Sequence, residues 1–285
     1  MLDQTTFDPD AMRRKREPVF NIPGVILGVL AVLVLVHVVR QVLPQATDER
    51  LLLNLAFEPG TFTYAFAPER VVSGLRLLAM QNEAGLQRAE LGQYILEQGG
   101  LRPWTVLTYG LLHADWSHIG LNGLWLLAFG TPVARRIGPV RFVALSLAAS
   151  VAGAAAHYIT HPVDLQPVIG ASAAVSGCMG AALRFMFQPD APRQTPDGDP
   201  AAARPVALTR LRDMLGNRRV MTFLLVWFVT NLLFGLGSVP FGLTSGAIAW
   251  EAHIGGFVFG MLAFDLFDRP GPVMLPPVEP DPAPP

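Results

Sequence analysis

Cysteine and charged side chains are both scarce in this 285-residue chain. The single cysteine, Cys178, excludes an internal disulfide and a zinc ribbon, because each needs more than one thiol. Charged residues make up only 15% of the chain, whereas a soluble domain carries about 25%. The formal net charge of −1 offers no basic surface for nucleic acid, so we expect no nucleic acid partner. These shortages favour an integral membrane protein.

Hydrophobic residues make up 51% of the chain and are concentrated in runs. A span needs about 20 predominantly apolar residues to cross the bilayer core. The runs that we expect to span cover residues 20–39, 118–133, 142–160, 167–187, 220–237 and 247–267. The first run could instead be a signal peptide, but no small-residue cleavage site follows it, so we expect a retained helix. The sequence therefore predicts an all-α membrane protein with six transmembrane helices.

Arginine is distributed unevenly among the connections between these runs. Basic residues precede the first run and follow the second and fourth, whereas residues 160–166 and 236–247 contain no Lys or Arg. Because positive loops stay on the cytoplasmic side, both termini should be cytoplasmic. Lys15 is the only lysine against twenty arginines, and we expect a multi-pass protein of a bacterial plasma (inner) membrane.

The runs also divide the chain into regions. Residues 1–19 would form a cytoplasmic N-terminal segment, residues 20–269 the membrane domain, and the proline-rich residues 270–285 a disordered tail. Within the membrane domain we expect an outer loop at about 40–117 and a cytoplasmic insert at about 190–219.

Two stretches of the outer loop contain apolar residues of their own. Residues 69–98 have helical apolar spacing, which predicts an amphipathic helix on the membrane surface. Residues 104–112 are apolar but too short to span, so they should lie in the interface or re-enter the membrane.

Four hydrogen-bonding side chains share a depth in the expected spans. His118 and Asn122 lie four residues apart near the outer start of the second run, and therefore on one helix face. Ser172 and His253 each lie about one and a half turns into a run that begins outside, at roughly 1.5 Å per residue. All four should lie within about a third of the membrane depth from the outer face.

These side chains suit nucleophilic catalysis. A serine needs a nearby base, and histidine is the usual one because its ordinary pKa is near neutral. Ser172 and His253 would supply this pair, while His118, Asn122 and the Ser172 backbone N–H would stabilise a developing oxyanion. Glu251 lies two residues from His253 and faces elsewhere on a helix, so we expect a dyad rather than a triad.

Structural interpretations compete with these roles. The small residues around Ser172 are by themselves more typical of helix packing, and Gly256 and Gly260 also favour a helix contact. Asn231 is more typical of an interhelical hydrogen bond than of a catalyst. Three further histidines fall at span ends and are expected at the interface: His37, His157 and His161.

Three ordered motifs connect these residues to a known family. They are residues 113–122 (HADWSHIGLN), 170–180 (GASAAVSGCMG) and 252–260 (AHIGGFVFG). Together they resemble the rhomboid intramembrane serine proteases, over roughly residues 103–267. The resemblance implies a six-helix rhomboid-like bundle that cleaves transmembrane helices of other proteins within the lipid bilayer. We expect neither a cofactor nor a metal, and the sequence does not indicate the oligomeric state.

The resemblance assigns roles to individual residues. It implies a nucleophilic Ser172, a general base His253, and an oxyanion hole built from His118, Asn122 and the Ser172 N–H. Further structural roles are implied for His113 as a hydrogen-bonding residue of the outer loop, for Trp104 as the anchor of its membrane-embedded hairpin, and for Gly255, Gly256 and Gly260 as the contact between the sixth and fourth spans.

Three positions depart from the family pattern. Ala173 stands where glycine commonly follows the nucleophile, and its methyl group could crowd the oxyanion hole. Ser176 stands where an aromatic ring commonly stacks on the catalytic histidine, so His253 could be less firmly oriented unless Ser176 bonds to it. Thr105 stands where arginine often follows the loop tryptophan.

Two other functions remain open on the sequence. A rhomboid-like pseudoprotease that binds membrane clients without cleavage is motivated by Ala173 and Ser176. A transporter or metal-binding protein is less favoured, because its ligands would have to converge on one point. His113 lies in the loop, and Glu251 faces away from His253. Its ligands would be His113, His118, Glu251 and His253.

Overall fold

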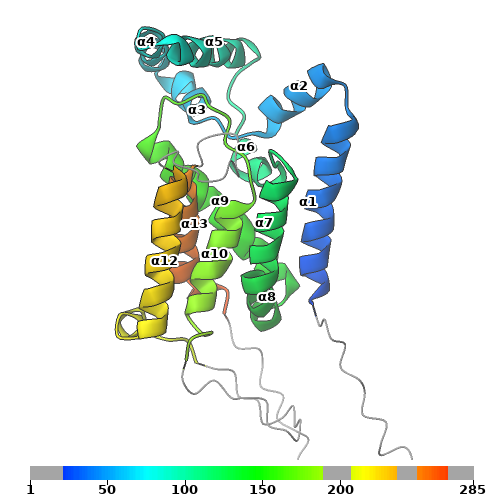
Figure 1. Ribbon diagram of the computed structural model, residues 1–285, viewed down its shortest axis with the longest axis vertical. Helices are drawn as coiled ribbons and strands as arrows, with labels where there is room; N and C mark the ends of the chain where they lie inside the picture. The colour runs from blue at the N-terminus through cyan, green and yellow to red at the C-terminus, as the bar shows by residue number, and fades with distance from the viewer. Residues whose placement is uncertain (1–21, 189–206, 236–248, 269–285) are drawn as a thin grey trace, which may run out of the picture.

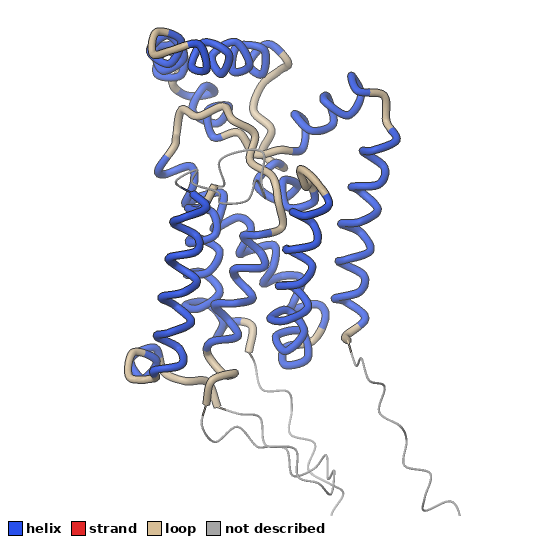
Figure 2. Tube along the Cα trace, viewed as in Figure 1, coloured by secondary structure: helices blue, strands red, loops and turns tan. Residues whose placement is uncertain are grey.

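The computed structural model describes residues 22–188, 207–235 and 249–268, and every regular element in these ranges is a helix (Figure 2). The prediction of an all-α protein is therefore confirmed for the described residues. The predicted N-terminal segment 1–19, residues 190–206 of the insert and the tail 270–285 lie outside them.

A group of helices packs side by side as a bundle in the described part of the chain (Figure 1). They are α1 (Gly24–Val42), α7 (Trp116–Trp125), α8 (Thr131–Ile137), α9 (Pro139–Thr160), α10 (Ser172–Leu183), α12 (Arg218–Gly235) and α13 (Trp250–Ala263). A π-helix, η3 (Leu126–Gly130), joins α7 to α8, and a 3₁₀ turn, η5 (Phe264–Leu266), ends α13. A four-residue helix, α11 (Leu211–Met214), precedes α12. Within the described residues, α1 and α9 are long and apolar enough to cross a membrane.

A second layer of helices covers one end of the bundle (Figure 1). It contains α2 (Gln45–Leu55), α3 (Pro59–Phe66), α4 (Pro68–Ala79), α5 (Glu83–Glu97), α6 (Thr105–Thr108) and the 3₁₀ turn η2 (Tyr109–Leu111). The stretch predicted as one amphipathic helix forms two, α4 and α5, because Asn82 caps a new helix by accepting a hydrogen bond from Gly85 N at 2.8 Å. Val71 of α4 and Ile95 of α5 are fully buried in this layer.

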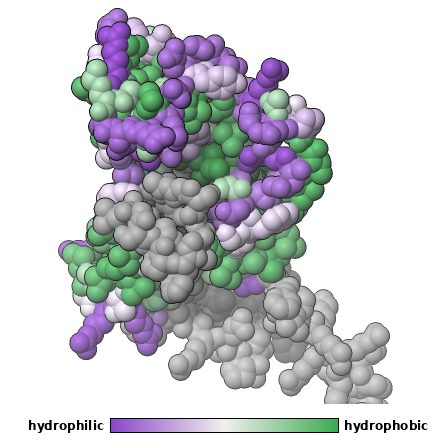
Figure 3. Space-filling model, turned by 45° about the horizontal axis from the view of Figure 1, so that its top comes forward, coloured by the Kyte–Doolittle hydropathy of each residue, from purple (hydrophilic) through white to green (hydrophobic). Residues whose placement is uncertain are grey.

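The outer surface of the bundle is apolar. Leu35 of α1 is 62% exposed, Val140 of α9 81% and Leu225 of α12 65%. Hydrophilic residues instead gather over the end that carries α2 to α5 (Figure 3). An exposed apolar surface on several helices is what a bilayer stabilises and water does not.

Helices α10 and α13 pack with their backbones in close contact. A Cβ atom at Gly256 would overlap the carbonyl oxygen of Ala173, and one at Gly260 would overlap that of Gly177. Gly255 differs from the prediction, since it faces Ala152 and Ala156 of α9 rather than α10. Neighbouring positions on a helix point about 100° apart, so adjacent glycines serve different partners.

Ion pairs close the opposite end of the bundle. Arg136 of α8 lies 2.7 Å from Asp268, and Arg184, at the end of α10, lies 2.9 Å from Asp265. Asp265 thus pairs with Arg184, and both ion pairs fix the end of α13 to its neighbours.

Residues 102–108, which include α6, attach to the C-terminal end of α2. Arg102, Trp104 and Thr108 donate side-chain hydrogen bonds to consecutive carbonyl oxygens, those of Leu53, Asn54 and Leu55 respectively. The last carbonyls of a helix lack intrahelical partners, so these bonds complete α2 while fixing the loop. Trp104 is half exposed and anchors the loop through this bond, whereas Thr105 is buried and bonds to Arg102 O at 2.7 Å.

A buried ion pair supports the same loop. The Arg102 guanidinium lies 3.7 Å from the Glu58 carboxylate, and both side chains are almost inaccessible. Burial raises the pKa of Glu58 to about 7, although the Arg102 charge opposes that shift.

The α10–α13 contact makes a testable prediction. We expect Gly260→Ala to lower the free energy of unfolding by about 1–3 kcal/mol, because the methyl group would force two backbones apart. Gly28→Ala on α1 is the matched control, since a Cβ there meets nothing within 4 Å. Thermal unfolding of the detergent-solubilised variants measures the difference. Equal stability of both variants would contradict the close packing.

Candidate active site

One cavity of about 890 Å³ brings together the residues predicted to act on a substrate. His118, Asn122, Ser172 and His253 all line it, at the ends where α7, α10 and α13 begin. The structure thus gathers four side chains of which the first and the last, His118 and His253, are 135 positions apart in the sequence.

Ser172 lies at the very start of its helix, which differs from the sequence prediction. It is the first residue of α10, and His253 is the fourth of α13, whereas both were expected about one and a half turns inside. The cause is the preceding segment, in which Val168 pairs with Phe57 through two backbone hydrogen bonds of 2.9 and 3.1 Å. The Ser172 N–H is consequently one of the unpaired donors of a helix N-terminus.

Gly170 makes the turn from this segment into α10. Its φ of 124° is accessible to glycine at little cost. A Cβ atom at this position would lie 2.8 Å from His118 Nε2 and 3.6 Å from Ser172 Oγ. Glycine therefore allows His118 and Ser172 to face the same small space.

His118 is oriented by hydrogen bonds at both its backbone and its ring. Asp115 caps α7 by accepting from His118 N at 2.8 Å, and the bonds that it accepts from Ser117 and His118 lower the pKa of Asp115. Ala114 N lies 3.5 Å from His118 Nδ1, which can accept its proton. The ring proton then belongs on Nε2, the atom that faces Gly170.

Asn122 lies one turn further along α7 and is buried. One of its amide protons is donated to His118 O at 3.2 Å. Because an amide carries two N–H donors, the second one is available to a group in the cavity.

His253 forms a hydrogen bond with Asn231, a residue for which we predicted no catalytic role. Its Nδ1 lies 2.6 Å from Asn231 Oδ1 on α12, and Asn231 Nδ2 donates to Trp227 O at 2.7 Å. With the amide protons directed at Trp227, Oδ1 can only accept, so Nδ1 carries the proton and Nε2 is left as the basic atom. Among the described residues no hydrogen bond joins His253 to Ser172.

The interhelical hydrogen bond expected of Asn231 is therefore present, but its partner is the predicted base. Sequence spacing could not reveal this, because the two residues lie on different helices and the connection between them gives no register. The signal available in the sequence was the amide side chain of Asn231 within an apolar run.

Ala173 and Ser176, which depart from the family pattern, pack without displacing the cavity residues. The methyl group of Ala173 packs against Gly153 of α9. A Cβ atom added to Gly153 would lie only 2.6 Å from the Ala173 Cβ. Ser176 is buried in the cavity wall, and no hydrogen bond links it to His253 in the part of the chain described. The hydrogen bond that His253 donates to Asn231 Oδ1, rather than a contact with Ser176, orients the imidazole.

His113 connects the outer loop to α10. It is fully buried, its carbonyl accepts from Arg40 at 3.0 Å, and its Nε2 lies 3.5 Å from Ala171 N. Burial and the neighbouring His118 lower the pKa of His113 to about 3, so the neutral ring can accept this proton. His113 thus has the hydrogen bonds of a structural residue.

The metal-ligand set considered from the sequence is not assembled. His113 and His118 are in ring contact at 4.9 Å, but Glu251 points to His157, with Oε2 3.3 Å from its Nδ1. His37 and His157, which we expected at span ends, are both buried within the protein.

Comparisons with known proteins identify the family of this chain. The Rhomboid domain family model matches residues 101–268. The chain is 32% identical to "Rhomboid protease GluP" of Bacillus subtilis (strain 168) over 160 residues, which is 56% of this chain and 25% of that protein. It is 24% identical to "RHOMBOID-like protein 4" of Arabidopsis thaliana over 212 residues, 74% of this chain and 44% of that protein.

The chain thus spans less than half the length of either relative. The family match itself covers more than half of this chain, and it includes the three motifs and every cavity residue from His118 to His253. The chain therefore belongs to the rhomboid family of membrane proteins.

Proposed function

We propose that this protein is a serine-type intramembrane endopeptidase that uses Ser172 as nucleophile and His253 as general base. The observation that carries the proposal is the hydrogen bond from His253 Nδ1 to Asn231, which leaves Nε2 unprotonated in a cavity that Ser172 also lines. The names of the relatives, which include a rhomboid protease, support the same activity.

The reaction follows from the tautomers of the two histidines. His253 Nε2 takes the Ser172 hydroxyl proton as Oγ attacks the substrate carbonyl carbon. The resulting oxyanion would be held by the Ser172 N–H, by His118 Nε2–H and by the second amide proton of Asn122. His253 then gives its proton to the leaving amine, and water releases the acyl group by the same steps in reverse order.

Transmembrane segments of other proteins are the substrates that fit the cavity. Its walls carry large apolar side chains from two helices, among them Leu121 and Trp125 of α7 and Phe223, Val226 and Trp227 of α12. An apolar chain could lie against these side chains while its peptide group reaches Ser172. A helical segment would have to unwind locally, because its amides are otherwise hydrogen-bonded within the helix.

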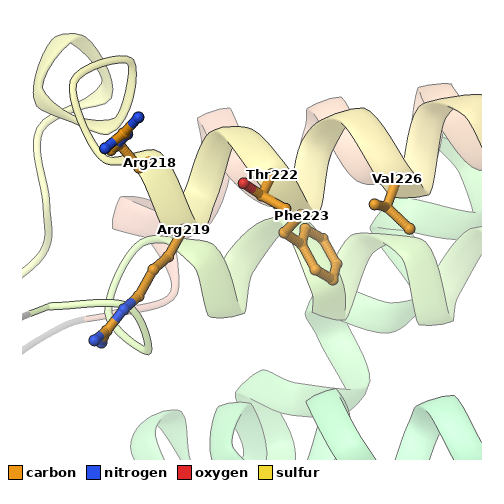
Figure 4. Close-up of a pocket in the computed structure, with 5 residues that line it drawn as sticks. All are labelled: Arg218, Arg219, Thr222, Phe223 and Val226. Atoms are coloured by element: carbon orange, nitrogen blue, oxygen red, sulfur yellow. The ribbon is translucent and has the colours of Figure 1, made fainter.

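We further propose six membrane spans with both termini in the cytoplasm of a bacterium. The charge pattern supports this topology, since Arg218 and Arg219 begin α12 and apolar residues such as Phe223 follow them (Figure 4). The second layer, α2 to α6, would then face outward together with the mouth of the cavity.

The alternative of a pseudoprotease gains no support from the residues that motivated it. The Ala173 methyl group packs on Gly153, and Asn231 supplies the orientation that a ring at position 176 would give.

The dyad predicts the loss of proteolysis in two variants. Ser172→Ala and His253→Ala should each reduce cleavage of a co-expressed model transmembrane substrate at least about a thousandfold, because nucleophile and base act as a unit. Immunoblotting of the cleavage product measures this, with membrane insertion of each variant checked in parallel. Full activity in either variant would contradict the dyad.

Asn231 should act as a positioning residue for His253. Asn231→Leu, which keeps the side-chain volume, should lower kcat by about tenfold or more with KM nearly unchanged, because the imidazole loses the bond that fixes its tautomer. Asn231→Asp restores an acceptor oxygen and should recover much of the rate.

The matched control is Asn54→Leu, the same chemical change at an exposed position of α2. Steady-state cleavage by the purified variants separates kcat from KM. A rise in KM alone, or equal losses in the Leu and Asp variants, would show that Asn231 does not position the base.

A further inference from the structure

A second cluster of titratable side chains lies in the wall of the cavity, apart from the proposed dyad. It consists of His157 on the last turn of α9, His161 directly after that helix, and Glu251 on the first turn of α13. Their candidate ligand atoms all lie within 4.8 Å of one another. The proposed proteolytic mechanism uses none of the three.

The two histidines are stacked on each other at the C-terminal end of α9. They lie four residues apart, and their rings stack with centroids 4.9 Å apart and an interplanar angle of 21°. The Glu251 carboxylate faces both rings, with Oε2 3.3 Å from His157 Nδ1 and Oε1 3.8 Å from His161 Nδ1. Each oxygen thus addresses a different imidazole.

These distances are close to those of a tetrahedral metal site. Zinc binds imidazole nitrogen and carboxylate oxygen at about 2.0–2.2 Å, so ligand atoms at a tetrahedral angle are separated by roughly 3.3–3.5 Å. The 3.3 Å separation between Glu251 Oε2 and His157 Nδ1 falls in this range, whereas the 3.8 Å separation to His161 Nδ1 is made by the other oxygen, Oε1. One metal ion would therefore require the His161 ring and the carboxylate to adjust as it binds, over ligand atoms that all lie within 4.8 Å of one another. His161 is 43% exposed at its side chain and can make that movement, exchanging its contact with Thr160 Oγ1 for a metal bond.

We propose that His157, His161 and Glu251 bind a divalent transition metal ion, with zinc the best fit to two imidazoles and one carboxylate. Calcium and magnesium are disfavoured because they prefer oxygen ligands alone. Three protein ligands leave a fourth position open to water or to a group in the cavity. The ion would join the end of α9 to the start of α13, two residues before His253.

Zinc binding by the purified full chain, without a histidine tag, tests this site directly. After removal of metal with EDTA, the detergent-solubilised protein should bind one equivalent of Zn²⁺ in isothermal titration calorimetry and melt at a higher temperature. His161→Gln and Glu251→Gln should each weaken zinc binding at least about tenfold. Even the loss of a residue that only hydrogen-bonds to a metal ligand weakens binding by that factor.

Two controls distinguish zinc binding at this site from the proposed proteolysis and from the loss of any one carboxylate. Glu90→Gln makes the same chemical change at an exposed position of α5 and should bind zinc like the wild type. Ser172→Ala should also bind zinc normally, so binding in an inactive protein supports the site whatever the fate of the protease assignment. Absence of zinc binding, or equal binding in the wild type and in both ligand variants, would overturn the proposal.

Discussion

The close contact between α10 and α13 is the constraint on which the rest of the site depends. Ser172 begins one of these helices and His253 lies in the first turn of the other. Their separation is set by how closely the two backbones approach, and Gly256 and Gly260 permit an approach that a single methyl group would prevent. The ion pairs at the far ends of α8 and α10 hold the same helices in register with the end of α13.

The hydrogen bonds around the cavity then decide what each side chain can do. In His118 the ring nitrogen that faces Ala114 can accept, so the opposite nitrogen can donate to a developing oxyanion. In His253 the nitrogen that faces Asn231 donates, so the opposite one can accept a proton. One hydrogen bond each thereby leaves the imidazole of His118 on α7 able to donate and that of His253 on α13 able to accept.

Much of this arrangement was predictable from sequence, and the exceptions have physical causes. Apolar runs predicted helices of the bundle, and the shared depth of four polar residues predicted that they lie together, because long apolar runs leave a strong pattern in a sequence. The start of α10 was missed because Val168 pairs with Phe57, more than a hundred residues away. The partner of Asn231 and the helix that Gly255 contacts depend on how each helix is rotated about its axis, which no local sequence pattern indicates. The cluster of His157, His161 and Glu251 was missed for the same reason, since it forms only when α9 and α13 meet.

The central claim is that Ser172 is chemically activated, and labelling with a fluorophosphonate serine-hydrolase reagent tests it without knowledge of a substrate. The detergent-solubilised wild-type protein should be labelled, and labelling should disappear in Ser172→Ala and His253→Ala. The absence of labelling in a well-folded wild-type protein would contradict the account. Labelling of both variants to the same extent as the wild type would also contradict it.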